Sequence, residues 1–239
     1  KRKGGKLNPE ERRKVHAEGA GYVLPRWSAA IRQVVTNPVI YDALMWAMYS
    51  GVRKSEIYRL QFTDFELKNG SYTIRVFKND IEGGKEVVLP LNDQLADIVA
   101  RRFDERLHGN PHLFWSTRSE SGHTASGADK FYSEISKAAG VKFWMHGFRN
   151  TFSTVASHGL FLPDTMVDRL CAREVDEDGK QNVGEGYKNA WTLGELRTQS
   201  QKIADRIDDH IAGRIEDNVI APAFIDDPRL QKMQVALDN

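Results

Sequence analysis

The stretch WMHGFRNTFSTVASHG, residues 144–159, sets two strong donors three residues apart at the start of an apolar helical pattern. These donors are His146 and Arg149. An imidazole exchanges a proton near neutral pH, and a guanidinium is a planar fork that can donate two parallel hydrogen bonds to an oxyanion. The pair therefore suits proton transfer beside a bound anion, although a helix-capping imidazole and an ion-paired arginine would give the same spacing.

Three further residues have side chains that could join such a site. Arg53 lies in SGVRKSEI, where Ser55 and Glu56 are expected to open a helix as its cap and its first-turn acid. Lys78 lies in RVFKNDIEGG, at the end of a predicted strand where a hairpin turn begins. Tyr187 follows a polar, glycine-bearing loop in EGYKNAW. Each has an ordinary explanation as well: a surface or ion-pairing arginine, a lysine that protects a strand edge, and an amphipathic surface tyrosine.

Helical periodicity covers most of the chain. Apolar residues recur at three and four places over 22–35 and 37–51, with Pro38 in a first-turn position and Gly51 where the second helix would stop. These two segments are predicted to be helices. The same periodicity, with Gly or Pro punctuation, predicts helices in 92–107, 125–140, 148–159, 163–175 and 192–213.

A small sheet is predicted after the first two of these helices. Residues 58–67, 71–77 and 85–91 are short runs of β-branched and aromatic residues, separated by the turn-forming KNG and NDIEGG. They predict a three-stranded antiparallel meander. The fold class is therefore α+β, mostly helical, with one small three-stranded antiparallel sheet on its edge.

The composition limits what kind of protein this is. The chain has 239 residues, 40% hydrophobic and 28% charged, which is enough to bury a core without disulfides. Its single cysteine, Cys171, excludes an internal disulfide framework, and no CxxC pair or Cys/His cluster offers a structural zinc site. No apolar run approaches the roughly 18 residues of a membrane span, and KRKGGK lacks the apolar core of a signal peptide. We expect a soluble, cytoplasmic protein without membrane partners.

Charge is distributed unevenly along the chain. The formal net charge is +1, but the first 14 residues hold seven cations against two anions, whereas 173–185 and the tail after Arg214 lean acidic. Binding of a polyanion would therefore depend on local clusters. With no internal repeat, low-complexity segment or interior linker, the sequence predicts one domain over 21–213, a basic arm or linker over 1–20 and a tail over 214–239.

The order of the motifs is more specific than any one of them. An arginine is followed 25 residues later by a hairpin lysine, then by HxxR, then after about 40 residues by a tyrosine. Over about residues 25–210, the chain resembles the catalytic domain of the tyrosine recombinases, the phage integrase family. The segments that carry this resemblance are SGVRKSEI, YTIRVFKNDIEGGKEVVLPL, HGFRNTFST, GLFLPDTMVDRL and YKNA. The pattern is most similar to that of the integrases of temperate phages and integrative islands. In it, HGFR is followed by TxxST, and a later tyrosine is followed by two polar residues and an alanine.

The resemblance implies a role for each of the five residues. Arg53 and Arg149 would clamp the non-bridging oxygens of a DNA phosphodiester. Tyr187 would attack the phosphorus with help from His146, and Lys78 would protonate the leaving 5′ oxygen. The product would be a 3′-phosphotyrosyl link that a second 5′-hydroxyl can reverse. Because the guanidiniums supply the electrostatic stabilisation that magnesium supplies elsewhere, no metal and no cofactor are expected.

The sequence departs from the family pattern at one position before the tyrosine. A second histidine or a tryptophan usually lies there, and the alignment of PDTMVDRLCA places Ala172 at that point. Alanine cannot donate a hydrogen bond. Arg173 is a candidate substitute, and Trp191 comes late in the chain. On the same hairpin, Lys85 is the second candidate for the role of Lys78 as the proton donor.

The resemblance implies a site-specific DNA recombinase, or integrase, that integrates or excises a mobile element. Its implied partners are double-stranded DNA at attachment or crossover sites, a homo-oligomer expected to be a tetramer on DNA, and accessory DNA-bending proteins, so we expect it on the nucleoid when bound to DNA. Two alternatives stay open: a DNA-relaxing enzyme similar to type IB topoisomerases, and a catalytically weak DNA-binding relative. The apolar residues of the tail favour docking on a neighbouring subunit, with packing on its own domain as the alternative.

Overall fold

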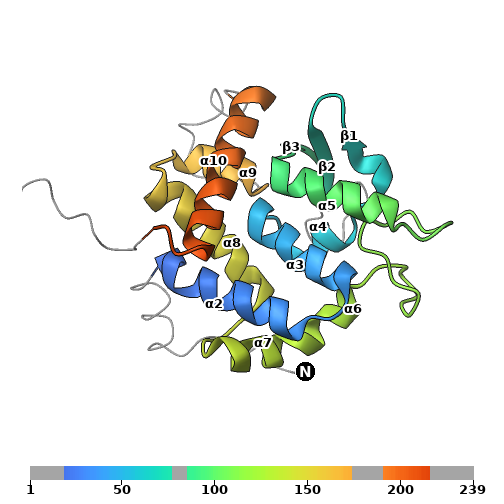
Figure 1. Ribbon diagram of the computed structural model, residues 1–239. Coiled ribbons are helices and arrows are strands. Elements are labelled where there is room, and N and C mark those ends of the chain that lie inside the picture. Colours follow the sequence, from blue (N-terminus) through green and yellow to red (C-terminus); the bar gives the residue numbers. More distant parts are fainter. Residues whose placement is uncertain (1–18, 77–84, 174–190, 216–239) are drawn as a thin grey trace, which may run out of the picture.

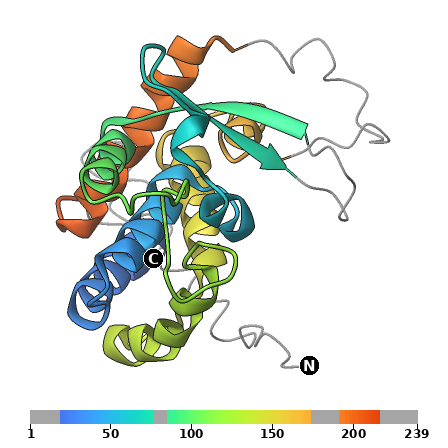
Figure 2. The ribbon, with the colours of Figure 1, turned by 90° about the vertical axis from the view of Figure 1, so that its right-hand side faces the viewer.

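Helices and one small sheet make up the computed structural model, which describes residues 19–76, 85–173 and 191–215. The sheet lies at one edge of the helical body (Figures 1 and 2). The helices are α2 (Gly19–Val34), α3 (Pro38–Ser50), α4 (Lys54–Tyr58), α5 (Asp93–Asp104), α6 (Ala125–Ala128), α7 (Tyr132–Ala139), α8 (Met145–Thr154), α9 (Asp164–Leu170) and α10 (Leu193–Ile211), with 3₁₀ turns η1 (Phe62–Asp64) and η2 (Asp129–Phe131) and a π-helical turn η3 (Val155–Gly159). The strands are β1 (Phe65–Glu66), β2 (Ser71–Val76) and β3 (Lys85–Pro90). The predicted class, mostly helical α+β with a small antiparallel sheet, is confirmed.

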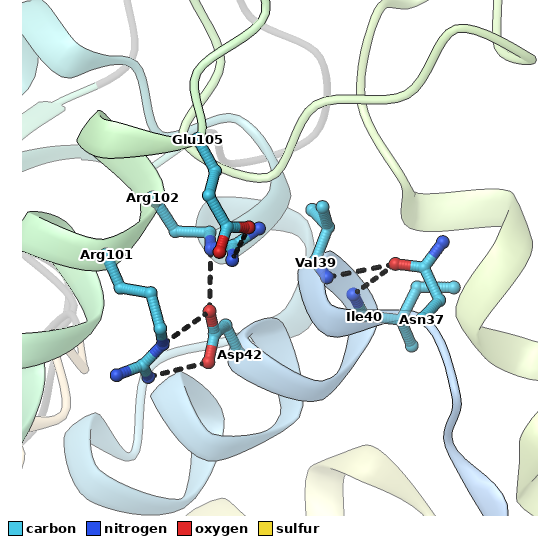
Figure 3. A network of polar contacts seen from close by, with 7 residues as sticks. All are labelled: Asn37, Val39, Ile40, Asp42, Arg101, Arg102 and Glu105. Carbon is cyan, nitrogen blue, oxygen red and sulfur yellow. Dashed lines mark hydrogen bonds and ion pairs between the residues drawn. The ribbon is translucent and has the colours of Figure 1, made fainter.

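Helix α3 has the boundaries that its sequence predicts. The Asn37 side chain accepts hydrogen bonds from the backbone N of Val39 at 2.9 Å and of Ile40 at 3.2 Å (Figure 3), and Pro38 occupies the first turn. An asparagine cap followed by proline is a strong helix start, because both satisfy or remove amide donors that the first turn leaves free. At the other end, Gly51 takes a left-handed φ of 64° and stops the helix.

A buried ion pair attaches α5 to α3. Asp42 of α3 is 1% exposed, and its carboxylate meets Arg102 Nε at 2.6 Å and Arg101 Nη2 at 2.8 Å. Arg102 also pairs with Glu105 (Figure 3). Buried charges are tolerated when they are paired in good geometry, and removing one partner leaves the other uncompensated. This network therefore fixes the position of α3, whose end leads directly to Arg53.

The sheet follows the predicted meander only in part. Strand order is β1-β2-β3, antiparallel, with Ser71 opposite Pro90 and Val76 opposite Lys85. The first predicted strand, 58–67, is wrong over most of its length, since only Phe65–Glu66 forms β1. The preceding residues turn into η1 because the Asp64 carboxylate accepts the backbone N–H of Gln61 at 2.8 Å, which stabilises a tight turn over an extended run.

An aromatic cluster supports the first turn of α8. The Trp27 ring of α2 lies 5.5 Å from the ring of Phe143, 5.6 Å from Trp144 and 5.5 Å from Phe148, all edge to face. A Cβ on Gly147 would lie 2.8 Å from Trp27 Cη2. The glycine of HGFR is thus required by close packing, and α2 sets the position of the helix that carries His146 and Arg149.

The predicted arm, 1–20, and tail, 214–239, lie almost entirely outside the described residues, so they stay predictions. Within the part that the structure describes, no helix is both long and apolar enough to cross a membrane.

Candidate active site

Arg53 is held by the acid three residues after it. Its backbone N donates to Glu56 Oε2 at 3.1 Å, and its Nη1 pairs with Glu56 Oε1 at 3.2 Å. Burial raises the pKa of Glu56, and the neighbouring Arg53 opposes that rise. The predicted first-turn acid is confirmed, but Ser55 is not the cap: it lies inside α4, and Arg53 itself occupies the cap position.

Arg149 reaches across the fold to two backbone carbonyls. Its side chain is almost wholly buried, and Nη1 donates to Gly51 O at 2.9 Å and to Cys171 O at 2.6 Å. Both hydrogen bonds use one nitrogen of the guanidinium. Within the described residues, no carboxylate lies within ion-pair distance of Arg149, so the ordinary explanation as an ion-paired arginine does not apply there.

Gly51 joins the segments that carry the two arginines. Its carbonyl accepts from Arg149, and Arg53 follows two residues later. A Cβ at this position would lie 2.7 Å from Phe152 Cδ1 and 3.1 Å from Cys171 Sγ, and its left-handed φ would strain any other residue. The sequence pattern around this glycine indicates only a helix stop, because a long-range carbonyl contact leaves no local pattern.

His146 lies in the first turn of α8, and its side chain is exposed. It is not the helix cap, because Trp144 occupies that position. The pKa of its imidazole is lowered by partial burial and then by the positive charges of Arg149, Arg53 and Arg173. Burial also lowers the pKa of Arg149, with Arg53 and Arg173 adding to the effect and Cys171 and Glu56 opposing it. The structure therefore brings Arg53, His146 and Arg149 into one electrostatically coupled group.

The arrangement is suited to an oxyanion beside a neutral imidazole. Arg53 is partly exposed and Arg149 keeps donors beyond Nη1, so both guanidiniums can offer charge-assisted hydrogen bonds to the same anion. The lowered pKa keeps His146 neutral at pH 7, which lets it accept a proton. Among the described residues, no group of three or more His, Cys, Asp or Glu side chains is placed to hold a metal ion.

Two predicted site residues, Lys78 and Tyr187, lie outside the described residues. Lys78 belongs to the connection between β2 and β3, and the second candidate, Lys85, begins β3 opposite Val76. Trp191 is partly buried against the core. The structure thus assembles three of the five predicted residues and leaves the nucleophile and the general acid as predictions.

Ser153 was missed by the sequence analysis. Its Oγ donates to Arg149 O at 2.9 Å and accepts from Arg173 Nη2 at 2.7 Å. The only signal in the sequence is its place in HGFRNTFST, four residues after Arg149 and so on the same side of the helix.

A family model described as the phage integrase family matches residues 28–159 of the chain. Among solved structures, the integrase from mycobacterium phage Brujita is similar with 16% sequence identity and a TM-score of 0.52, over 90% of this chain and 66% of that one. This likeness supports the fold.

Two further structures are similar at lower TM-scores. The XerA recombinase has 18% identity and a TM-score of 0.49, over 71% of this chain and 56% of that one. A lambda integrase(75-356) dimer bound to a COC' core site has 16% identity and a TM-score of 0.49, over 66% of this chain and 57% of that one. The chain thus spans between 56% and 66% of these three relatives. None of the curated proteins matches it.

Proposed function

The chain belongs to the phage integrase family, and we propose that it is a site-specific DNA recombinase that cleaves and rejoins strands through a 3′-phosphotyrosine intermediate. The observation that carries this proposal is the grouping of Arg53, His146 and Arg149. They come from two segments almost a hundred residues apart and meet through the carbonyl of Gly51. Two guanidiniums beside a neutral imidazole match what a phosphodiester needs in order to be attacked.

The reaction starts when the phenolic oxygen of Tyr187 attacks the phosphorus and the bond to the 5′ oxygen breaks. Arg53 and Arg149 stabilise the negative charge that grows on the non-bridging oxygens. His146 takes the phenolic proton, and Lys78 gives a proton to the leaving 5′ oxygen, so both protons are accounted for. A 5′-hydroxyl from another strand then reverses the same steps and rejoins the DNA. The charge of the arginines makes the reaction independent of a metal.

Tyr132 is the first alternative nucleophile, and its surroundings disfavour it. Its hydroxyl donates to Met145 Sδ at 3.4 Å. Burial, followed by the charges of nearby Tyr58 and Asp129, raises the pKa of the phenol far above its ordinary value. A phenol so hard to ionise is a poor nucleophile, which supports Tyr187.

The proposed partner is double-stranded DNA at a crossover site. Exchange of both strands of two duplexes needs four cleavages, and each copy of the chain offers one nucleophile, so a tetramer is the expected assembly on DNA. A type IB topoisomerase-like enzyme would need only one copy. Relaxation of supercoiled plasmid without any product joined to a second duplex would favour that alternative.

The test is a nicked suicide duplex that contains the cognate crossover site. When the short 5′-hydroxyl fragment diffuses away, rejoining stops because its effective concentration collapses, and protein stays on DNA as a covalent adduct in a denaturing gel. Tyr187→Phe keeps the ring and removes the oxygen, so it should abolish the adduct while DNA binding persists. Tyr132→Phe is the matched control and should form the adduct normally.

An adduct that persists in Tyr187→Phe and disappears in Tyr132→Phe would reassign the nucleophile. The same assay in EDTA tests metal independence. Loss of cleavage on chelation, restored by magnesium, would place the chain in a different class of nuclease.

A further inference from the structure

The end of α9 turns the chain so that Arg173 folds back over the helix. Ala172 has a left-handed φ of 48°, and the backbone N of Arg173 donates to Asp168 O at 2.8 Å. Arg173 Nη1 pairs with Asp168 Oδ1 at 2.9 Å. The Ala172 side chain is buried and carries no polar group, at the position where the family resemblance leads one to expect a donor.

The end of α10 repeats this local geometry. Gly213 has a φ of 66°, Arg214 N donates to Asp209 O at 2.9 Å, and Arg214 Nη2 pairs with Asp209 Oδ1 at 2.7 Å. An ion pair with the aspartate five residues earlier therefore follows from how these helices end. It gives no functional information about Arg173, and it makes Arg214 a matched control.

Arg173 differs from Arg214 by a second contact, across to α8. Its Nη2 donates to Ser153 Oγ at 2.7 Å, and that hydroxyl donates to the backbone O of Arg149. Arg149 in turn donates to the carbonyl of Cys171, two residues before Arg173. One serine and one carbonyl thus tie the two arginines together, and the charge of Arg173 helps to lower the pKa of both Arg149 and His146.

We propose that Arg173 is a third donor to the scissile phosphate, contacting a non-bridging oxygen in place of the side chain that Ala172 lacks. A guanidinium has five N–H donors, and the side-chain contacts to Asp168 and Ser153 use two of them. The side chain is 37% exposed, so the remaining donors are accessible to a ligand. Three arginines repel one another until an anion enters, which favours phosphate binding. The identity of the phosphate as DNA rests on the proposed function.

Single-turnover cleavage of the suicide duplex at saturating protein gives the first test. Arg173→Ala should slow cleavage by roughly 10- to 100-fold, somewhat less than loss of a full oxyanion donor, while DNA affinity changes little. Arg173→Lys should recover part of the rate because it keeps the charge. Arg214→Ala, which removes the same charge from the matching helix end, should cleave at the wild-type rate.

Asp168→Asn separates the phosphate role from a structural one. It breaks the ion pair and keeps the cation, so cleavage should fall far less than in Arg173→Ala. Equal losses in the two variants would mean that the ion pair matters only for local structure, and the inference would be wrong.

Titration with inorganic phosphate, followed through the His146 imidazole NMR signals, gives a test that needs no DNA cleavage. Among the described residues, the charged groups that act on His146 are Arg149, Arg53 and Arg173. Arg173→Ala should weaken the phosphate response and raise the pKa of His146, whereas Arg214→Ala should change neither. Unchanged values in Arg173→Ala would overturn the inference. If wild-type protein forms no adduct on its crossover site but its phosphate response depends on Arg173, the recombinase proposal fails and the anion site stands.

Discussion

Arg102 and Arg149 are both buried, but the fold surrounds them very differently. Arg102 has no exposed surface and lies against two carboxylates, those of Asp42 and Glu105. Arg149 is 3% exposed and meets two backbone carbonyls, with Arg53 and Arg173 as further cations nearby. The first arginine is paired with carboxylates within the protein, whereas the second, among the described residues, has only backbone carbonyls as hydrogen-bond partners.

The contrast indicates that burial alone does not mark an arginine as functional, and that the lack of a paired carboxylate within the described residues is the more informative feature. A buried charge without a paired carboxylate costs folding free energy, and binding of an external anion would offset that cost. At the margin of the site, Glu56 pairs with Arg53 and Asp168 pairs with Arg173. These carboxylates hold the outer arginines in place, and among the described residues no carboxylate forms an ion pair with Arg149, on which Glu56 acts only at longer range.

The largest effect is expected in the paired region. Asp42→Ala should lower the free energy of unfolding by up to about 3–5 kcal/mol, because it leaves the fully buried Arg102 with only the partly exposed Glu105 as a carboxylate partner. Urea unfolding measures this. Asp209→Ala, which breaks the exposed pair with Arg214, is the control and should cost about 1 kcal/mol or less. Similar losses in both variants would show that the buried pair is no more important than a surface one.

At the unpaired arginine, activity should suffer more than stability. Arg149→Ala should slow single-turnover cleavage by about 100- to 1,000-fold, since one transition-state donor contributes about 3–4 kcal/mol. Its unfolding free energy should change less than that of Asp42→Ala. Cleavage at the wild-type rate would make Arg149 a structural residue like Arg102.

The packing under α8 should have a moderate effect on both properties. In Gly147→Ala the added methyl meets the rigid rings of Trp27 and Trp144, at 2.8 and 3.2 Å, so we expect a loss of about 1–3 kcal/mol in stability and slower cleavage as His146 and Arg149 shift. Gly194→Ala in α10 meets nothing within 4 Å and should be neutral or stabilising by up to about 1 kcal/mol. Thermal melts and cleavage rates of the two variants test whether α8 is positioned by this contact.

The smallest effect concerns pH. The pKa of His146 is lowered from its ordinary value of 6.5, so protonation, and with it the loss of the general base, requires a lower pH than for a free imidazole. Cleavage should therefore stay constant from pH 8 to 7 and fall only below 6.5. Rates measured across this range check the sign. A decline that begins above pH 7 would mean that the neighbouring cations do not act on this imidazole.

Much of the fold follows from local patterns. Asn37, Pro38 and Gly51 define α3 because capping and left-handed geometry depend on residues within one turn. The spacing in HGFR places His146 and Arg149 three residues apart on one helix, as the structure confirms. The first strand and the Ser55 cap were wrong, because a side chain such as Asp64 or Glu56 can redirect a short segment that propensity alone would assign differently.

The residue types that could act, their order along the chain and the elements that carry them can be predicted from the sequence. The contact of Arg149 with the carbonyl of Gly51, 98 residues away, and the bridge from Ser153 to Arg173 exist only in the folded chain. Such contacts depend on how α8 packs against α2, α3 and the end of α9, and packing is a property of surfaces brought together from distant segments. No local propensity or periodicity encodes the distance between them, and so none could distinguish a neutralised arginine from one left free to bind an anion.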